Sequence, residues 1–195
     1  MRTSTPFCAF LVDSWRTRLF RKEIFPGFPF VPPDWIALAF NRDNHGDVRL
    51  PDETWQKLIV EILKRTREQV ALIVSPEPLI AGTVAELEQP FVVPLNGPSM
   101  LAHFADTSRY LPEFFMAGAS ERWAIWGDSD LTVVGGEREM MSAIIDNIGG
   151  VPAALVMMTN DFALCESPDD SDMHLYLRAL LDLLPGEPGS THVSD

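Results

Sequence analysis

The chain of 195 residues is 46% hydrophobic and carries a formal net charge of −13. This hydrophobic content supports a packed core and excludes a globally disordered chain, and the length favours a single domain. A negative charge of this size argues against binding to nucleic acid or to a membrane surface, because both are polyanionic. No stretch approaches the about 20 apolar residues that span a membrane.

The cysteine content and the N-terminal sequence indicate the compartment. Cys8 and Cys165 are the only cysteines, which is too few for a disulfide scaffold and suits a reducing environment. The apolar run Phe7–Val12 ends at Asp13 and is shorter than the hydrophobic part of a secretory signal. We therefore expect a cytoplasmic protein.

The charge is distributed unevenly along the chain. Residues 1–70 hold 11 lysines and arginines against 9 acidic residues, whereas residues 71–195 hold 4 arginines against 19 acidic residues. A field of this sign attracts basic proteins. The same charge also serves solubility, and both interpretations stay open at this point.

Prolines mark the N-terminal segment as irregular, because proline at high density opposes regular structure. We expect a Pro-rich N-terminal arm over residues 1–34, a single domain over residues 35–186 and a frayed tail over residues 187–195. The prolines of the arm are Pro6, Pro26, Pro29, Pro32 and Pro33.

A basic cluster lies within this arm, at Arg16, Arg18, Arg21 and Lys22. The pattern there also allows a short helix around Asp13–Glu23. We expect the cluster to pair with the acidic domain or to be solvated, because the surrounding negative charge opposes binding of phosphate or RNA.

Hydrophobic patterns predict a strand, a helix and a second strand in the first half of the domain. Trp35–Phe40 and Val70–Val74 are short apolar runs typical of buried strands. Between them, Pro51–Glu68 is amphipathic, with acidic residues at its start and basic residues at its end, as the helix dipole prefers. A helix between two strands favours a right-handed parallel crossover. The expected buried face of the helix comprises Trp55, Leu58, Ile59, Ile62 and Leu63.

The central feature of the chain is a predicted β-hairpin. Two apolar runs, Trp123–Trp126 and Leu131–Val134, flank the turn Gly127–Asp130. Alternation along the first run leaves both of its faces apolar, so we expect a central strand that is covered on both sides. Gly135-Gly136 then begins an amphipathic helix, which Gly149-Gly150 closes.

Further short elements complete the predicted fold. Phe91–Val93 and Phe114–Met116 are strand candidates, whereas Ala154–Met158 is compatible with either a strand or a buried helix. A last helix starts at Ser167-Pro168, because serine is a good N-cap and proline a good first residue, and it ends at Pro185. These elements predict an α/β or α+β single domain with a mixed sheet of about five strands flanked by helices.

Two acidic loops have residue types that bind divalent cations elsewhere. Asp128-Ser129-Asp130 has the form of the DxD element of some sugar transferases, and Asp43–Asp47 is similarly acidic. A calcium loop counted from Asp128 places Val133 where glycine is required, and one counted from Asp43 places Thr54 where glutamate is required. We therefore interpret both segments as turns and expect no metal ion.

No catalytic motif is complete. Ser99 and Ser120 both lack the second glycine of the G-x-S-x-G nucleophile elbow. The four histidines are widely separated, and we expect His174 to be solvated. Gly135-Gly136 lies before a helix but has neither the P-loop nor the dinucleotide-binding pattern. We therefore expect no catalytic residues and no cofactor.

One region resembles a known class of proteins. Phe114–Met116, Ser120–Asp128 and Leu131–Gly135 are similar to the aromatic hairpin region of small bacterial immunity proteins that neutralise polymorphic toxins. The resemblance covers about a tenth of the chain. It implies a small, acidic, cytoplasmic and non-enzymatic protein that covers the active site of a toxin, and the acidic charge suits a basic nuclease.

These observations lead to one main hypothesis and two alternatives. The main hypothesis is a non-enzymatic acidic binding protein, an immunity protein that binds a toxin domain with a basic surface. The first alternative is a structural or regulatory adaptor that forms a homodimer through exposed aromatic residues near Phe25–Trp35. The second is an uncharacterised hydrolase or metal-dependent enzyme with its site at the end of the hairpin. The predicted partner-binding residues are Asp128, Asp130, Glu137, Glu139, Asp169, Asp170 and Asp172.

Overall fold

A computed structural model provides the fold of the chain. It describes residues 6–21, 27–75, 90–95, 102, 104–106, 111–164 and 171–182. The remaining residues, among them Lys22, Asp169 and Asp170, lie outside the described part, and so does the predicted helix start at Ser167-Pro168.

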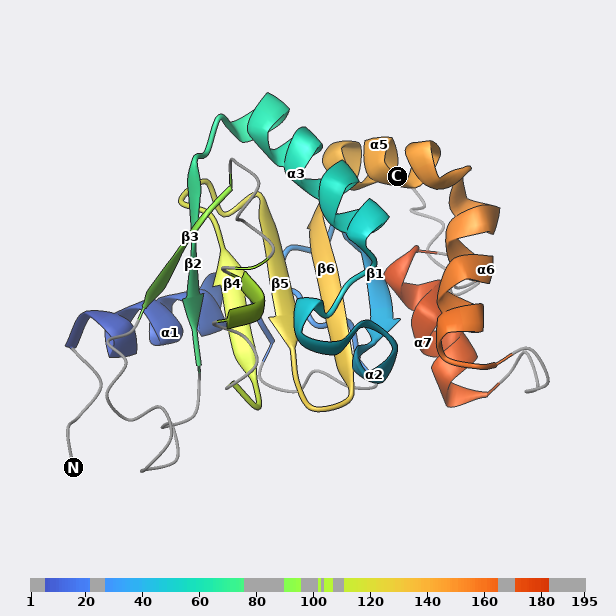
Figure 1. The fold of residues 1–195 in the computed structure, drawn as a ribbon, viewed down its shortest axis with the longest axis horizontal. Coiled ribbons are helices and arrows are strands. Elements are labelled where there is room, and N and C mark those ends of the chain that lie inside the picture. Colours follow the sequence, from blue (N-terminus) through green and yellow to red (C-terminus); the bar gives the residue numbers. More distant parts are fainter. Residues whose placement is uncertain are drawn as a thin grey trace, which may run out of the picture.

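The protein is a single α+β domain built on one antiparallel sheet of six strands (Figure 1). The order across the sheet is β1-β6-β5-β4-β2-β3, and every neighbouring pair is antiparallel. The predicted mixed sheet of about five strands is therefore corrected to an antiparallel sheet of six. The strands are β1 (Trp35–Asn41), β2 (Val70–Val74), β3 (Phe91–Pro94), β4 (Phe114–Ala117), β5 (Trp123–Gly127) and β6 (Leu131–Glu137).

The predicted crossover does not join two neighbouring strands. β1 and β2 run in the same direction, but β6, β5 and β4 lie between them and separate them in the sheet. The helix that joins them, α3 (Asp52–Thr66), therefore crosses the face of the sheet rather than linking neighbours (Figure 1).

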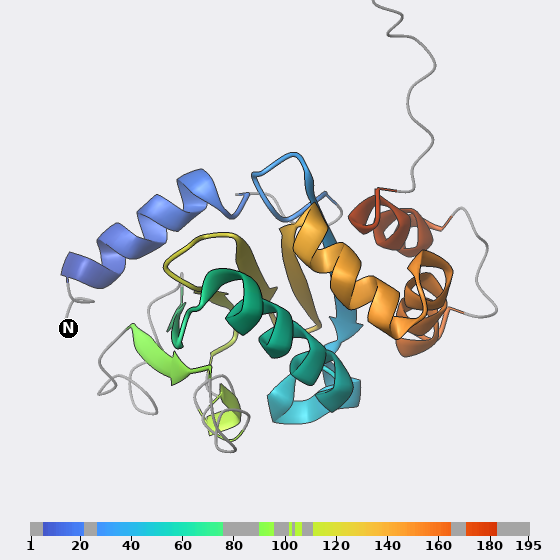
Figure 2. The same cartoon turned by 90° about the horizontal axis from the view of Figure 1, so that it is seen from above.

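Helices cover both faces of the sheet. α3 and α1 lie on opposite sides of it (Figure 2), whereas α6 and α7 pack against the edge strand β1. The helices are α1 (Pro6–Arg18), α2 (Arg42–His45), α3, α5 (Arg138–Ile148), α6 (Val151–Asp161) and α7 (Asp172–Leu180), with a 3₁₀ turn at Gly46–Val48.

The segment Ala154–Met158, which the sequence left open, is helical. It belongs to α6, whose first turn carries Pro152, a residue that is well tolerated at a helix start. α5 and α6 are the only described pair of helices that together have the length and composition of a membrane span, and they are bent by 77° at their junction; no single described helix has both properties.

The central hairpin is confirmed by β5 and β6, and every residue of β5 is buried. The helix that follows begins later than expected, at Arg138, because Gly135 and Gly136 still belong to β6. Both glycines are paired on two sides, with β1 and with β5. A Cβ atom on Gly135 would lie 2.3 Å from the ring of Phe30, so the strand passes too close to that ring for any side chain.

Aromatic residues from the N-terminal segment form part of the core on the face opposite α3. Phe20 stacks on Phe115 of β4 with ring centroids 4.2 Å apart, and Phe30 lies 5.3 Å from the ring of Trp35. A backbone bridge joins Phe20 to Phe30. The expectation of exposed aromatic residues near Phe25–Trp35 is therefore wrong for Phe30 and Trp35, which are both buried.

The N-terminal helix and its basic residues also differ in detail from the prediction. α1 covers Pro6–Arg18 rather than Asp13–Glu23. Arg18 forms an ion pair of 2.7 Å with Glu121, and the guanidinium of Arg21 donates to the backbone carbonyl of Phe30. Arg18 thus contacts the chain through a carboxylate, and Arg21 through a backbone carbonyl.

Gly135→Ala tests the close approach of the N-terminal segment to the sheet. We expect the substitution to lower the free energy of unfolding by about 1–3 kcal/mol, because the buried Phe30 ring has to move. Chemical denaturation of Gly135→Ala in the wild-type background and in a Phe30→Leu background measures the coupling. An equal cost in both backgrounds would contradict this packing.

Candidate functional site

The predicted contact residues do not form one surface. Asp128 and Asp130 lie in the turn before β6, whereas Glu137 ends this strand and Glu139 lies in the first turn of α5. β6 has seven residues, so these two pairs are roughly 20 Å apart. Asp172 begins α7, in a third location.

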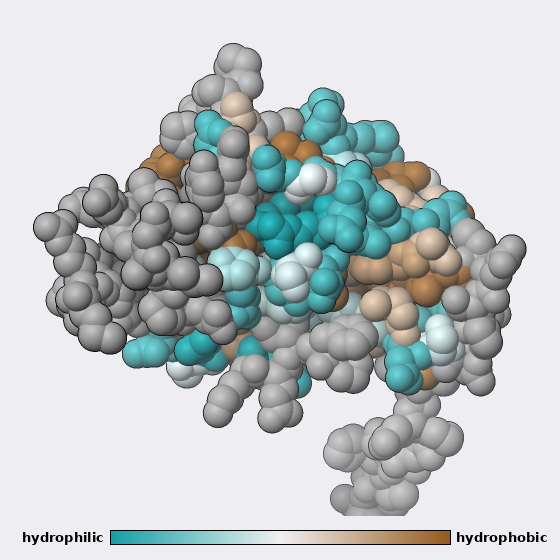
Figure 3. All heavy atoms as spheres, turned by 60° about the horizontal axis from the view of Figure 1, so that its bottom comes forward, coloured by the Kyte–Doolittle hydropathy of each residue, from teal (hydrophilic) through white to brown (hydrophobic). Residues whose placement is uncertain are grey.

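The hairpin tip uses its carboxylate to build the turn. Oδ1 of Asp128 accepts the backbone N–H groups of Asp130 and Leu131, both at 2.8 Å. The backbone carbonyl of Asp128 accepts from the side chains of Arg42 and Arg49, at 3.0 and 3.1 Å. These contacts support the interpretation of Gly127–Asp130 as a turn. Figure 3 shows that hydrophilic residues gather over this turn and α2.

Arg49 is the buried group that anchors the tip. Its side chain also donates to the carbonyl of Leu111 at 2.9 Å and lies over the ring of Phe114, 5.0 Å from the centroid. Burial and the nearby charge of Arg42 lower the pKa of Arg49 to about 10. The guanidinium therefore remains charged at neutral pH and holds the turn in place.

Arginine–glutamate pairs organise the opposite end of the sheet. Both Glu137 oxygens accept from the guanidinium of Arg122, with an Nε–Oε1 distance of 2.8 Å, and Glu139 accepts from Arg65, also at 2.8 Å. The hydrogen bond from Arg65 lowers the pKa of Glu139, and the bond to Glu137 raises that of Arg122. Each of these carboxylates is thus paired with an arginine of the same chain.

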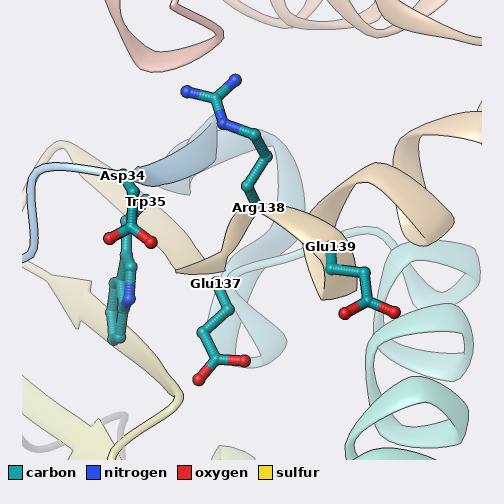
Figure 4. A pocket seen from close by; sticks show the side chains of 5 residues that line it. All are labelled: Asp34, Trp35, Glu137, Arg138 and Glu139. Carbon is teal, nitrogen blue, oxygen red and sulfur yellow. The ribbon is translucent and has the colours of Figure 1, made fainter.

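An open hollow of about 530 Å³ lies at this end of the sheet (Figure 4). Trp35 and Glu137 stand directly opposite each other on β1 and β6, so their side chains share one face. Arg138 points away from the carboxylates in Figure 4 and pairs with Asp182 at 2.8 Å. The hollow is lined by Asp34, Trp35, Glu137, Arg138 and Glu139.

One carboxylate of the hollow has no basic partner among the described residues. Glu137 and Glu139 are matched by Arg122 and Arg65, whereas Asp34 is exposed and pairs with no basic group in the described residues. A site with this balance suits a ligand that brings one positive charge.

Sequence reasoning found Glu137 and Glu139 but missed their surroundings. The sequence pattern predicts only a strand that starts at Trp35 and a hairpin region that includes Arg122, and it gives Asp34 no functional role. Their proximity follows from the β1–β6 pairing, which joins residues about 100 positions apart. The one local signal was the position of Asp34, a charged residue at the start of a strand that is otherwise apolar.

Polar contacts elsewhere join helices to one another. Asp161, at the end of α6, accepts from the backbone N–H of Asn41 and the side chain of Asn44, and lies 3.0 Å from Nε2 of His45. The expectation that His174 is solvated is wrong. His174 belongs to α7 and is buried, and Oγ of Ser171 lies 3.1 Å from its Nδ1. No group of three or more potential metal ligands clusters within the described residues.

A scan against protein families and searches among curated proteins and solved structures find no match to this chain.

The pairing of Glu61 with Arg65 predicts a pH dependence of stability. The hydrogen bond from Arg65 lowers the pKa of the buried Glu61 carboxylate below its ordinary value of 4.5. Near pH 4 the unfolded chain binds more protons than the folded one, so the free energy of unfolding decreases as the pH falls through this range.

Glu61→Gln is expected to flatten this decrease between about pH 5 and pH 3, as measured by denaturation at a series of pH values. The control is Glu53→Gln on the same helix, where the side chain is 77% exposed. Equal pH profiles for wild type and Glu61→Gln would contradict the prediction.

Proposed function

We propose that the protein is a non-enzymatic binding protein that holds a basic protein partner, and that it acts as an immunity-type inhibitor of a toxin. The observation that carries the proposal is the open hollow, in which the carboxylates of Asp34, Glu137 and Glu139 face solvent from a rigid end of the sheet.

The carboxylates are prearranged for binding. Arg122 holds Glu137 through two contacts, and Arg65 holds Glu139 against α3. Groups that are already fixed lose little conformational entropy when a partner binds. The excess of acidic residues after residue 70 would speed the encounter with a basic surface through long-range attraction.

Toxin neutralisation is the finer part of the proposal. The similarity of the hairpin region to immunity proteins supports it, and such a protein works by covering an active site. A basic nuclease is the partner class that best suits the charge, because its nucleic-acid surface is positive. On this proposal the protein acts in the cytoplasm, where a nuclease would find its substrate.

The test is affinity capture from native lysate, with the immobilised full chain and salt elution. We expect the wild type to retain one basic protein in stoichiometric amount and to release it as the salt concentration rises. The double variant Asp34→Asn/Glu139→Gln should retain much less. The matched control is Asp146→Asn, an exposed aspartate of α5 that does not line the hollow, which should retain as much as the wild type.

Two results would count against this function. One is that no stoichiometric partner is retained by the wild type. The other is that the double variant and the wild type retain the partner equally while circular dichroism shows both to be folded.

The homodimeric adaptor is the second candidate, and α6 is the observation that favours it. The helix is almost entirely apolar, yet only Ala154 and Met158 are buried and Val156 is 57% exposed. A hydrophobic area lies over α6 in Figure 3. Because α6 has no charged residue before Asp161, two copies of this acidic chain can meet there without opposing like charges.

Sedimentation velocity at micromolar concentration tests the adaptor. A dimer through α6 should dissociate in Val156→Asp, because the new carboxylates would be buried against each other. Val60→Asp on the outer face of α3 is the matched control, since Val60 is similarly exposed, at 60%. A wild-type chain that remains monomeric excludes this candidate.

A further inference from the structure

Trp35 differs in its polar atom from three other buried tryptophans, Trp55, Trp123 and Trp126. Its side chain is almost fully buried, at 5% exposure, and its indole Nε1 donates no hydrogen bond to any described residue but is not itself among the fully buried polar atoms, so it keeps access to solvent. Indole N–H groups that lose water normally find an acceptor, because leaving one unpaired costs free energy. The indoles of Trp55, Trp123 and Trp126 do so, with the carbonyl of Val48 and the carboxylates of Glu68 and Glu113.

The indole donor of Trp35 opens into the hollow. Trp35 lines the hollow, and Figure 4 shows its nitrogen on the edge of the ring that is turned toward Glu137. The ring packs against Phe30. The exposed fraction of Trp35 is therefore an edge that offers a hydrogen-bond donor.

This donor and the carboxylates specify two features of a ligand. The indole N–H requires a neutral or negative acceptor. Asp34, which has no basic partner among the described residues, can take one cation, and Glu139 lines the same hollow. A bare cation would satisfy Asp34 but leave the indole unpaired.

We propose that the hollow binds one arginine residue of the partner protein. Its guanidinium lies between Asp34 and Glu139, and its backbone carbonyl accepts the indole N–H of Trp35. This inference rests on the proposed binding function and names the residue type that the acidic surface recognises.

Arginine fits better than lysine for a geometric reason. The planar guanidinium donates in two directions at once and is weakly hydrated, so it can bridge two carboxylates at low desolvation cost. The volume of about 530 Å³ lies within the range of ordinary ligand sites and exceeds that of a single side chain, which leaves room for the backbone next to it.

Nuclear magnetic resonance of the ¹⁵N-labelled full chain tests the site directly, with N-acetyl-L-argininamide as the probe. The five tryptophans give separate indole signals, and Trp35→Phe identifies that of Trp35. We expect only the Trp35 indole signal to move in a saturable manner. The neutral isostere N-acetyl-citrullinamide should move it much less, because it lacks the cation.

Variants separate the two halves of the proposed contact. Asp34→Asn should weaken binding of the probe by about tenfold, the scale of one charge-assisted hydrogen bond. Asp146→Asn, an exposed aspartate of α5 that does not line the hollow, is the matched control and should leave it unchanged. The inference is overturned by an unmoved Trp35 signal, by an equal response to citrullinamide, or by an unchanged affinity in Asp34→Asn.

Failure of this inference is distinct from failure of the proposed function. If a captured basic partner binds Trp35→Phe and Asp34→Asn as tightly as the wild type, the arginine site is wrong and the binding function stands. If the probe binds at Trp35 but no protein is retained from lysate, the site stands and the function is wrong.

Discussion

The burial of β5 and β6 on both faces is the constraint on which the rest of the structure depends. Both strands lie inside the sheet, so each needs apolar cover on two sides. α3 and α5 provide it on one side, and the N-terminal aromatic residues provide it on the other. Two glycines leave room for large rings: Gly127 for Phe114, its cross-strand partner on β4, and Gly135 for Phe30 of the N-terminal segment.

This constraint also determines where charge is placed. Since neither face of the central strands is free, polar groups collect at the two ends of the sheet. At one end the buried side chain of Arg49 donates a hydrogen bond to the backbone carbonyl of Asp128 and so anchors the hairpin turn. The turn therefore has a structural role. At the other end Glu137, the last residue of β6, accepts a hydrogen bond from Arg122. Trp35 of β1 lies directly opposite Glu137. The candidate site thus results from the way in which the core is closed.

The candidate site is organised by ion pairs within the chain. The carboxylates of Glu137 and Glu139 are paired with Arg122 and Arg65 of the same chain, and the hydrogen bond from Arg65 lowers the pKa of Glu139. In the proposed function, binding specificity depends on the groups that no residue of the chain matches, which are Asp34 and the indole donor of Trp35.

The sequence by itself determined the local elements: the amphipathic α3, the hairpin of β5 and β6, and the glycine that ends α5. Each depends on periodicity or turn chemistry within about ten residues. Only the tertiary structure decided the strand order, the helical state of Ala154–Met158 and the hollow. Trp35 and Glu137 meet because strands about 100 residues apart pair in one register, and a local pattern does not say which distant strand will be the partner.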